Sequence, residues 1–194
     1  MDFSKDITLE NERALLRPLT SSDLDVLLPF SLNEPDLWEY SLVPGNGEEN
    51  LKEYLVQAIK MRTKEDSYPF LVIDKLTNEV AGSTRFYDYS KTHNTVQLGY
   101  TWYGKKFQGT GLNKNCKYLM LAFAFDSLGL DRVEFRADNN NKRSIAAMKS
   151  IGCIEEGVLR SNCASPTGRR DSIVLSILKD EWNNQIKKNL ILRL

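Results

Sequence analysis

Histidine is nearly absent from this chain, which has one, His93, among 194 residues. A Ser-His-Asp or Cys-His site would have to use it. His93 stands in the polar run Ser90–Asn94, which predicts an exposed turn residue rather than a held catalytic base. The three cysteines are widely spaced and form no CxxC pair, so neither a zinc cluster nor a disulfide framework is predicted. We expect reduced thiols and no metal.

An excess of charge of one sign and long apolar runs are also lacking. Lys plus Arg and Asp plus Glu number 26 each, so there is no basic footprint for nucleic acid and no global attraction to an anionic membrane. No apolar run approaches the length of a bilayer span, and the N-terminus has no apolar signal segment. We predict a soluble cytoplasmic protein without nucleic-acid or membrane partners. The length fits one domain over residues 1–194.

Hydrophobic periodicity predicts both strands and helices. Strands are expected at 13–17, 70–74, 80–87, 94–103, 132–137, 153–159 and 171–178, and helices at 24–28, 48–63, 112–128, 142–150 and, short and polar, from Asp180. The stretch 33–47 has no regular pattern. Because strands and helices mix without strict alternation, we predict an α+β fold with a mixed sheet and helices on both faces.

The segment with the clearest chemistry is the turn Gln108–Asn113, between strand 94–103 and helix 112–128. A glycine-bearing turn that opens a helix exposes unpaired N–H groups beside the positive end of the helix dipole, which suits a pyrophosphate. Nearby lysines add positive charge: Lys105, Lys106, Lys114 and Lys117. No Walker A or Rossmann pattern is complete. On these residues alone, a plain surface turn and a ligand site are equally good interpretations.

A family resemblance favours the ligand site. Gln108–Asn113 resembles the Gln/Arg-x-x-Gly-x-Gly/Ala acetyl-CoA motif of the GNAT superfamily, with Gln108 in first position and Gly111 as the central glycine. Further segments are similar to the RimJ/RimL-type branch: Leu15–Leu19, Gly82-Ser83, Asn141–Ser144, Ile151–Cys153 and Glu156-Gly157. Asn113 and Cys153 depart from the usual Gly/Ala and Phe, but neither change removes a backbone N–H from the turn.

The resemblance implies a mixed, mostly antiparallel sheet of about seven strands with a splayed strand pair that binds acetyl-CoA. The pantetheine arm would pair along the end of strand 96–103, with the thioester near Tyr100–Tyr103 and the pyrophosphate on the turn. The cofactor-binding residues implied in this way are Trp102, Tyr103, Gln108, Gly109, Thr110, Gly111, Leu112, Asn113 and Asn141.

The implied reaction is acetyl transfer to a primary amine by direct attack in a ternary complex. Ser144 falls where similar proteins place a serine near the CoA sulfur, so it is the first candidate to protonate the thiolate. A hydroxyl satisfied by backbone is an equal alternative. Tyr100 is a second candidate, although a core aromatic role fits it better. No general base stands out, because Glu134 alternates with Arg132 and Arg136 in an expected ion-paired surface row.

The acceptor side of the site is expected in the irregular stretch 33–47, since binding residues concentrate on loops. Trp38, Glu39 and Tyr40 are the candidate substrate-binding residues, with Glu34 and Asp36 as further charges for a cationic amine. A solvated loop anchored by its aromatics is the favoured alternative. The missing base is compatible with an N-terminal α-amine or a small amine, because an α-amine needs deprotonation less than a lysine does.

Two other functions and one assembly stay open. The turn would also serve a non-catalytic acyl-CoA-binding or sensor module, or a nucleotide-binding protein, although the missing Lys-Ser/Thr counts against the latter. By analogy with similar proteins, a homodimer is one expectation. Tyr87 and Tyr89, expected to be exposed, are its candidate contact residues.

Overall fold

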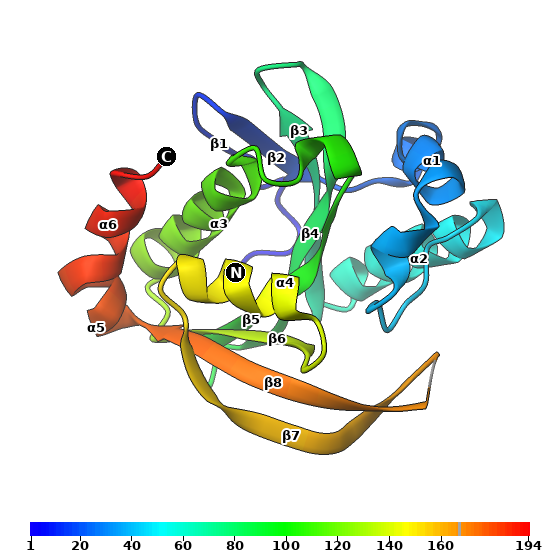
Figure 1. Cartoon of the computed structure of the whole chain (residues 1–194). Helices are drawn as coiled ribbons and strands as arrows, with labels where there is room; N and C mark the ends of the chain where they lie inside the picture. Colours follow the sequence, from blue (N-terminus) through cyan, green and yellow to red (C-terminus); the bar gives the residue numbers. More distant parts are fainter. Residues whose placement is uncertain (167) are drawn as a thin grey trace.

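The computed structural model describes residues 1–166 and 168–194 and contains an eight-stranded sheet (Figure 1). Its strands are β1 Leu9–Glu10, β2 Ala14–Pro18, β3 Ser67–Asp74, β4 Glu79–Ser90, β5 Thr95–Tyr103, β6 Arg132–Asp138, β7 Ile154–Ser165 and β8 Gly168–Leu178. The order is β1-β2-β3-β4-β5-β6-β8-β7. Every neighbouring pair is antiparallel except β5 and β6, which are parallel. The predicted mixed, mostly antiparallel sheet is confirmed. The added strand is β1, whose two residues are too few to show a periodic pattern.

Helices lie on both faces of the sheet, as predicted (Figure 1). Helices α1 Leu24–Asn33 and α2 Glu48–Thr63 cover one face, and α3 Leu112–Ala122 and α4 Lys142–Ser150 cover the other. The shorter helical segments are η1 Ser21–Asp23, η2 Pro35–Trp38, η3 Lys105–Phe107, η4 Phe123–Ser127, α5 Lys179–Glu181, η5 Trp182–Ile186 and α6 Lys187–Ile191. Each face has its own apolar core, which buries Leu71 and Trp102 on the α2 side and Leu98 and Phe135 on the α3 side.

Two helices differ from the sequence prediction. Helix α1 continues through Pro29 to Asn33, past its predicted end at Leu28. The C-terminal helix is longer than expected, because α5, η5 and α6 follow one another without interruption. It is also more buried than a polar surface helix. Trp182 in this segment is fully buried, and its ring stacks 5.5 Å from that of Phe125. The predicted C-terminal helix is therefore present, and tertiary packing of Trp182 accounts for a length that the sequence did not predict.

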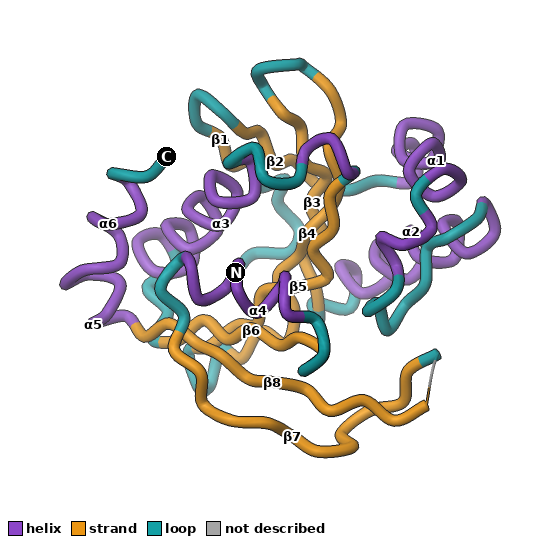
Figure 2. Tube along the Cα trace, viewed as in Figure 1, coloured by secondary structure: helices purple, strands orange, loops and turns teal. Residues whose placement is uncertain are grey.

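The last two strands are also longer than predicted. Beyond Asp138, the end of β6, strands β7 and β8 go on pairing with each other as far as Ser165 and Gly168 (Figure 2). Within this extension, Arg170 of β8 reaches the loop after η2, where its Nη1 lies 3.5 Å from the Tyr40 carbonyl oxygen. The hairpin thus approaches the segment that the sequence analysis assigns to the acceptor.

Candidate active site

Strands β5 and β6 pair only at their beginnings and then separate. Their parallel ladder joins Thr95–Gln97 to Arg132–Glu134 and stops there, although both strands continue. A cleft of about 510 Å³ is lined by the diverging ends of both strands, including Leu98–Tyr103 and Phe135–Asp138. The predicted splayed strand pair is therefore present, and we call the space between the two strands the wedge.

Strand β5 contains a β-bulge at Tyr100 and Thr101, and these two side chains lie on opposite faces of the sheet. Gly99 pairs with Arg85 and Trp102 with Ser83, so the two residues between them face one residue of β4. Within this bulge Tyr100 has a left-handed φ of +49°. Its ring lies on the α2 face, 4.2 Å from the Arg85 guanidinium carbon. The next residue, Thr101, contacts helix α3 instead, as described below.

The turn Gln108–Asn113 presents free backbone donors beside the wedge. Gly109 and Gly111 have φ of +75° and +88°, and a Cβ added at either would meet no atom within 4 Å. In the described part of the chain, the N–H groups of Gly109, Thr110, Gly111 and Asn113 donate to no protein acceptor. Free donors facing open space at the N-terminus of α3 fit a pyrophosphate.

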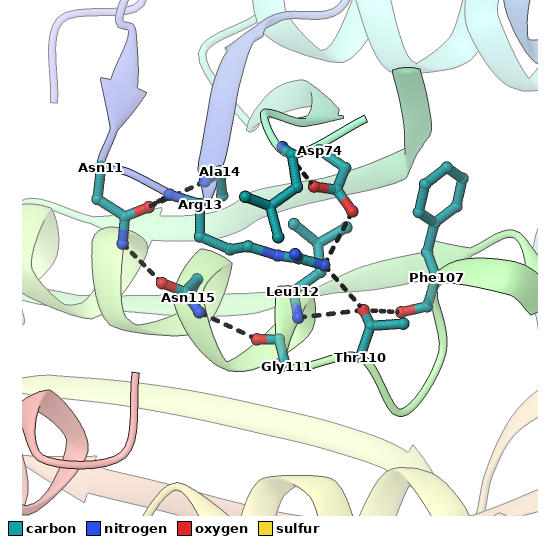
Figure 3. Close-up of polar contacts among 10 residues, drawn as sticks. Asn11, Arg13, Ala14, Asp74, Phe107, Thr110, Gly111, Leu112 and Asn115 are labelled. Carbon is teal, nitrogen blue, oxygen red and sulfur yellow. Dashed lines mark hydrogen bonds and ion pairs between the residues drawn. The ribbon is translucent and has the colours of Figure 1, made fainter. Parts of the chain in front are cut away.

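The far side of this turn is braced by side chains (Figure 3). Thr110 Oγ1 donates to the Phe107 carbonyl oxygen at 2.8 Å and accepts from Arg13 Nη2 at 3.3 Å. The same Arg13 nitrogen pairs with Asp74 at 2.9 Å. Because the Thr110 side chain points to this brace, its backbone N–H alone remains for a ligand.

A second set of contacts fixes the start of α3 (Figure 3). Asn115 Nδ2 donates to the Gly111 carbonyl oxygen at 3.2 Å, and its Oδ1 accepts from Asn11 Nδ2 at 2.8 Å. Asn11 Oδ1 in turn accepts from the backbone N–H groups of Arg13 and Ala14. These bonds hold the turn in place before any ligand arrives, which lowers the cost of binding.

Several predicted cofactor residues have structural contacts of their own. Gln108 Nε2 donates to the Tyr103 carbonyl oxygen at 2.8 Å, and its Oε1 accepts from Arg143 Nη1 at 2.7 Å, so its side chain links β5 to α4. Leu112 is fully buried in the α3-side core. Trp102 and Tyr103 are each 7% exposed and form walls of the cleft. Their predicted binding role stays a prediction.

Helix α4 brings Asn141 and Ser144 to the cleft. Asn141 is the N-cap, and its Oδ1 accepts from the Ser144 N–H at 3.0 Å. Within residues 1–166 and 168–194, the Ser144 Oγ makes no hydrogen bond, so it is not the backbone-satisfied hydroxyl of the alternative interpretation. Asn113, on the first turn of α3, also lines the cleft, and its buried Oδ1 has no hydrogen-bond partner among the residues that the structure describes.

Three of the four lysines that the sequence places near the turn make contacts elsewhere. Lys105 pairs with Asp36 at 3.1 Å, and Lys106 pairs with Glu79 at 2.6 Å. Lys117 points into the wedge rather than to the turn, since it lines the cleft and contacts β5.

Lys117 is the site residue that sequence analysis misjudged. It is 6% exposed, and its Nζ donates to Thr101 Oγ1 at 2.7 Å. Burial lowers the pKa of its amine to about 7. A signal was available, because Lys117 stands four residues after Asn113, which lines the cleft, and four before Leu121, which is fully buried, so helical spacing places it on an inward face.

On the acceptor side, Trp38, Glu39 and Tyr40 all line the same cleft. Trp38 is 5% exposed, with its ring 4.9 Å from that of Trp102 and 5.6 Å from that of Tyr54. Trp38 therefore anchors the segment to the core, as the favoured alternative states. Glu39 is exposed and Tyr40 is half-buried.

Two acids of this segment are already engaged. Glu34 Oε2 accepts from the Lys105 N–H at 2.7 Å, and Asp36 holds the Lys105 ammonium. Both acids tie the segment to η3, and their predicted attraction for a cationic amine stays a prediction.

The structure also tests the predictions made for Glu134, Tyr87 and Tyr89. The ion-paired row is confirmed, with Glu134 at 2.9 Å from Arg132 and 2.7 Å from Arg136. The exposed positions expected for Tyr87 and Tyr89 are wrong. Tyr87 lines the cleft, with its ring 5.1 Å from that of Tyr100, and burial raises its pKa well above the usual value. The Tyr89 ring packs 6.0 Å from that of Phe3.

His93 is exposed in a turn, as predicted. Cys116 and Cys153 are buried as free thiols, and Cys163 is also free. Among the residues described, no cluster of three or more His, Cys, Asp or Glu could hold a metal ion. None of the described helices has the length and apolar character that crossing a membrane requires.

Comparison with known proteins identifies the class that this geometry defines. The model of the acetyltransferase (GNAT) domain matches residues 13–154, and the chain belongs to this family of acyltransferases. The predicted family is confirmed. The N-acetyltransferase p20 of Bacillus licheniformis, described as uncharacterized, is 26% identical over 176 residues, 90% of this chain and 98% of its own.

Two further relatives agree. YdaF of Bacillus subtilis, provisionally named a ribosomal N-acetyltransferase, is 28% identical over 106 residues, 55% of this chain and 57% of its own. This likeness is consistent with the RimJ/RimL-like branch. A crystal structure from T. thermophilus, provisionally titled an acetyltransferase, superposes with a TM-score of 0.86 at 32% identity over 96% of both chains.

Proposed function

We propose that this enzyme transfers the acetyl group of acetyl-CoA to a primary amine by direct attack in a ternary complex. The proposal rests on a single cleft that is lined by residues from both faces of the sheet. Its lining includes Gly109 and Ser144 on the α3–α4 face and Trp38 and Tyr54 on the α2 face. Donor and acceptor can enter from opposite faces and meet in the wedge, which replaces a bimolecular encounter by a positioned one.

Acetyl-CoA is the cosubstrate that supplies the activated acetyl group. The free N–H groups of Gly109, Thr110, Gly111 and Asn113 would bind its pyrophosphate. Beyond Gln97, the edge of β5 that faces β6 pairs with none of the described strands and is available to amides of the pantetheine arm. The unpartnered Asn113 Oδ1 can accept from such an amide, and Asn141 lies beside it in the cleft.

Two hydroxyls can donate a proton during the reaction. Ser144 Oγ faces the cleft without a protein partner among the described residues, which supports its predicted role at the leaving thiolate. Burial raises the pKa of Tyr100, so its hydroxyl stays protonated at neutral pH. Tyr100 lies on the α2 face, which favours a role near the attacking amine.

For the acceptor, we propose the α-amine of a protein N-terminus. The provisional name of YdaF supports this choice. The engagement of Glu134 by two arginines also supports it, because that glutamate is not a free base, and an α-amine is more readily deprotonated than a lysine amine. Trp38, Glu39 and Tyr40 would contact the residues that follow the amine.

The test is CoA release from acetyl-CoA against N-terminal peptides, polyamines, aminoglycosides and amino acids. Gly111→Trp should fill the open space before the turn and abolish turnover. Gly129→Trp is the matched control, because Gly129 also has a left-handed φ, of +69°, and open surroundings, but lies outside the cleft. Tight acetyl-CoA binding without turnover of any acceptor would favour a sensor module. Loss of activity in both variants would contradict the assignment of the turn.

A further inference from the structure

We propose that Lys117 is a catalytic residue whose Nζ–H protonates the CoA sulfur as the thioester breaks. This inference rests on the acetyl transfer proposed above and adds a proton donor outside the turn and outside helix α4.

The amine of Lys117 lies inside the wedge. Lys117 Nζ donates to Thr101 Oγ1 at 2.7 Å, and Thr101 stands four residues beyond Gln97, the last residue of β5 paired with β6. Nζ also lies 5.9 Å from the ring centroid of Phe135, the first residue of β6 after the paired stretch. These two contacts place the amine between the diverging strands, inside the wedge that the acyl-pantetheine arm would enter.

The burial of the Lys117 charge also supports a catalytic role. Lys117 is 6% exposed, and no ion pair of the described residues includes it, whereas the partly buried Arg13 and Arg17 pair with Asp74 and Asp23. A buried ammonium without a carboxylate is costly, and a chain without a use for it would be more stable with an apolar residue. A developing thiolate in the wedge would supply the missing negative charge.

The Lys117 amine can also gain and lose a proton near neutral pH. Titratable groups that act on Lys117 are the thiols of Cys116, on its own helix, and Cys153, after α4. Burial outweighs both and brings the pKa of the amine to about 7, so protonated and neutral forms coexist near neutral pH. That balance is what general acid catalysis requires.

The hydroxyl beside Lys117 orients it. Thr101 Oγ1 lies 2.7 Å from Thr84 Oγ1 and 3.3 Å from the Gly99 carbonyl oxygen. Its own proton can go to either of these, which leaves a lone pair to accept from Nζ. Lys117 therefore keeps two N–H bonds for a ligand in the cleft.

The step balances without a further reactant. The acceptor nitrogen forms a bond to the acetyl carbon, the carbon–sulfur bond breaks, and its electron pair goes to sulfur. Sulfur takes a proton from the Lys117 ammonium and leaves as the free thiol of CoA. Neutral Lys117 then takes the proton that the new amide nitrogen loses, directly or through water, and returns to its starting state.

The first experiment needs no acceptor. CoA is bound to the wild type and to Lys117→Met, and the ultraviolet absorbance of the thiolate is followed from about pH 6 to pH 10, which brackets an ordinary thiol near 8.5. We expect the thiol of bound CoA to ionise roughly one pH unit or more lower in the wild type, because thiolate and ammonium form a pair. Lys149→Met, an exposed lysine of α4 paired with Glu155, is the matched control and should titrate like the wild type.

The outcomes separate this inference from the proposed function. Equal titration of CoA bound to wild type and Lys117→Met would overturn the role of Lys117 while leaving acetyl transfer intact. Failure of wild type to bind CoA would overturn the proposed function, and this inference with it. If Lys117→Met does not fold, Lys117→Gln takes its place in the same titration.

The second experiment uses the acceptor found by the panel. Lys117→Met should lower kcat by roughly 100-fold, the size of a lost general acid, with little change in the KM for acetyl-CoA. Wild-type kcat should decrease as the pH rises through about 7, and Lys117→Met should remove this limb of the pH profile. Ser144→Ala should keep it. A variant of Lys117 that retains both kcat and the limb would show a structural role only.

Discussion

Two buried cations flank the wedge, one on each face of the sheet, and they are held in different ways. On the α3 face, Lys117 donates a hydrogen bond to Thr101 at 2.7 Å. On the α2 face, Arg85 is 4% exposed, and its guanidinium carbon lies 4.9 Å from the ring centroid of Tyr54 and 4.2 Å from that of Tyr100. In the described structure, Arg85 Nε and Nη2 have no hydrogen-bond partner.

The difference follows from the chemistry of the two side chains. A guanidinium is delocalised, weakly hydrated and permanently charged, so aromatic faces can hold it in a dry site. An ammonium is compact and loses its proton readily when buried. The α2 face therefore carries a fixed positive charge, and the α3 face carries one that can switch. The proposed proton transfer to the CoA sulfur uses only the second of these charges.

The largest effect is expected where β4 and β5 approach closely, next to the bulge that carries Tyr100 and Thr101. In Gly82→Ala, the added Cβ would lie 2.1 Å from the Trp102 carbonyl oxygen. We expect a loss of about 3 kcal/mol or more in the free energy of unfolding, because backbone must move. Urea denaturation measures it. Gly109→Ala, with φ of +75° and open surroundings, should lose about 1–2 kcal/mol. Equal losses in the two variants would contradict the tight contact at Gly82.

A smaller effect is expected in how the stability contributions of Lys117 and Arg85 depend on pH. The pKa of Lys117 is about 7 in the folded protein and near 10.4 in an unfolded chain, so between these values the unfolded chain binds more protons. Wild-type stability should therefore rise with pH across this window relative to Lys117→Met. The variant should be the more stable by a few kcal/mol at about pH 7 and below, and this advantage should vanish near pH 10.

Arg85→Met is the matched comparison for this measurement. Because a guanidinium stays protonated in both states, its effect on the free energy of unfolding should be the same at about pH 6, 8 and 10. Urea unfolding at these three pH values tests both variants. A pH-independent effect of Lys117→Met would show that its amine does not titrate in the folded protein.

The smallest effect is expected for an ion pair that water reaches. Lys105 and Asp36 lie 3.1 Å apart, with side chains 57% and 75% exposed. Asp36→Asn should cost less than about 0.5 kcal/mol and change acetyl-CoA affinity by less than about twofold, because solvent screens the pair. Urea unfolding and calorimetric titration measure the two quantities. A fivefold loss of affinity would mean that this pair helps to shape the turn.

Local sequence explains why some elements were predictable. Helices 48–63 and 142–150 were placed with the observed bounds, since their apolar spacing and end residues are local signals. The turn before α3 was found from its glycines and from the family resemblance. By contrast, β1 pairs with β2 over two residues, and the C-terminal helix depends on burial of Trp182 against Phe125. Such contacts join distant residues, and no local pattern encodes them.

The succession of the main strands and helices, the glycine turn and the acyltransferase family could be predicted from the sequence, because each depends on neighbouring residues or on motifs in order. Which charged groups are free depends instead on the tertiary structure. It paired Lys105, Lys106 and Glu34 with partners elsewhere in the chain, and it buried Lys117 beside Thr101 where β5 leaves β6. The pKa and the accessibility of a charged group depend on its surroundings in space, and distant segments of the chain supply those surroundings.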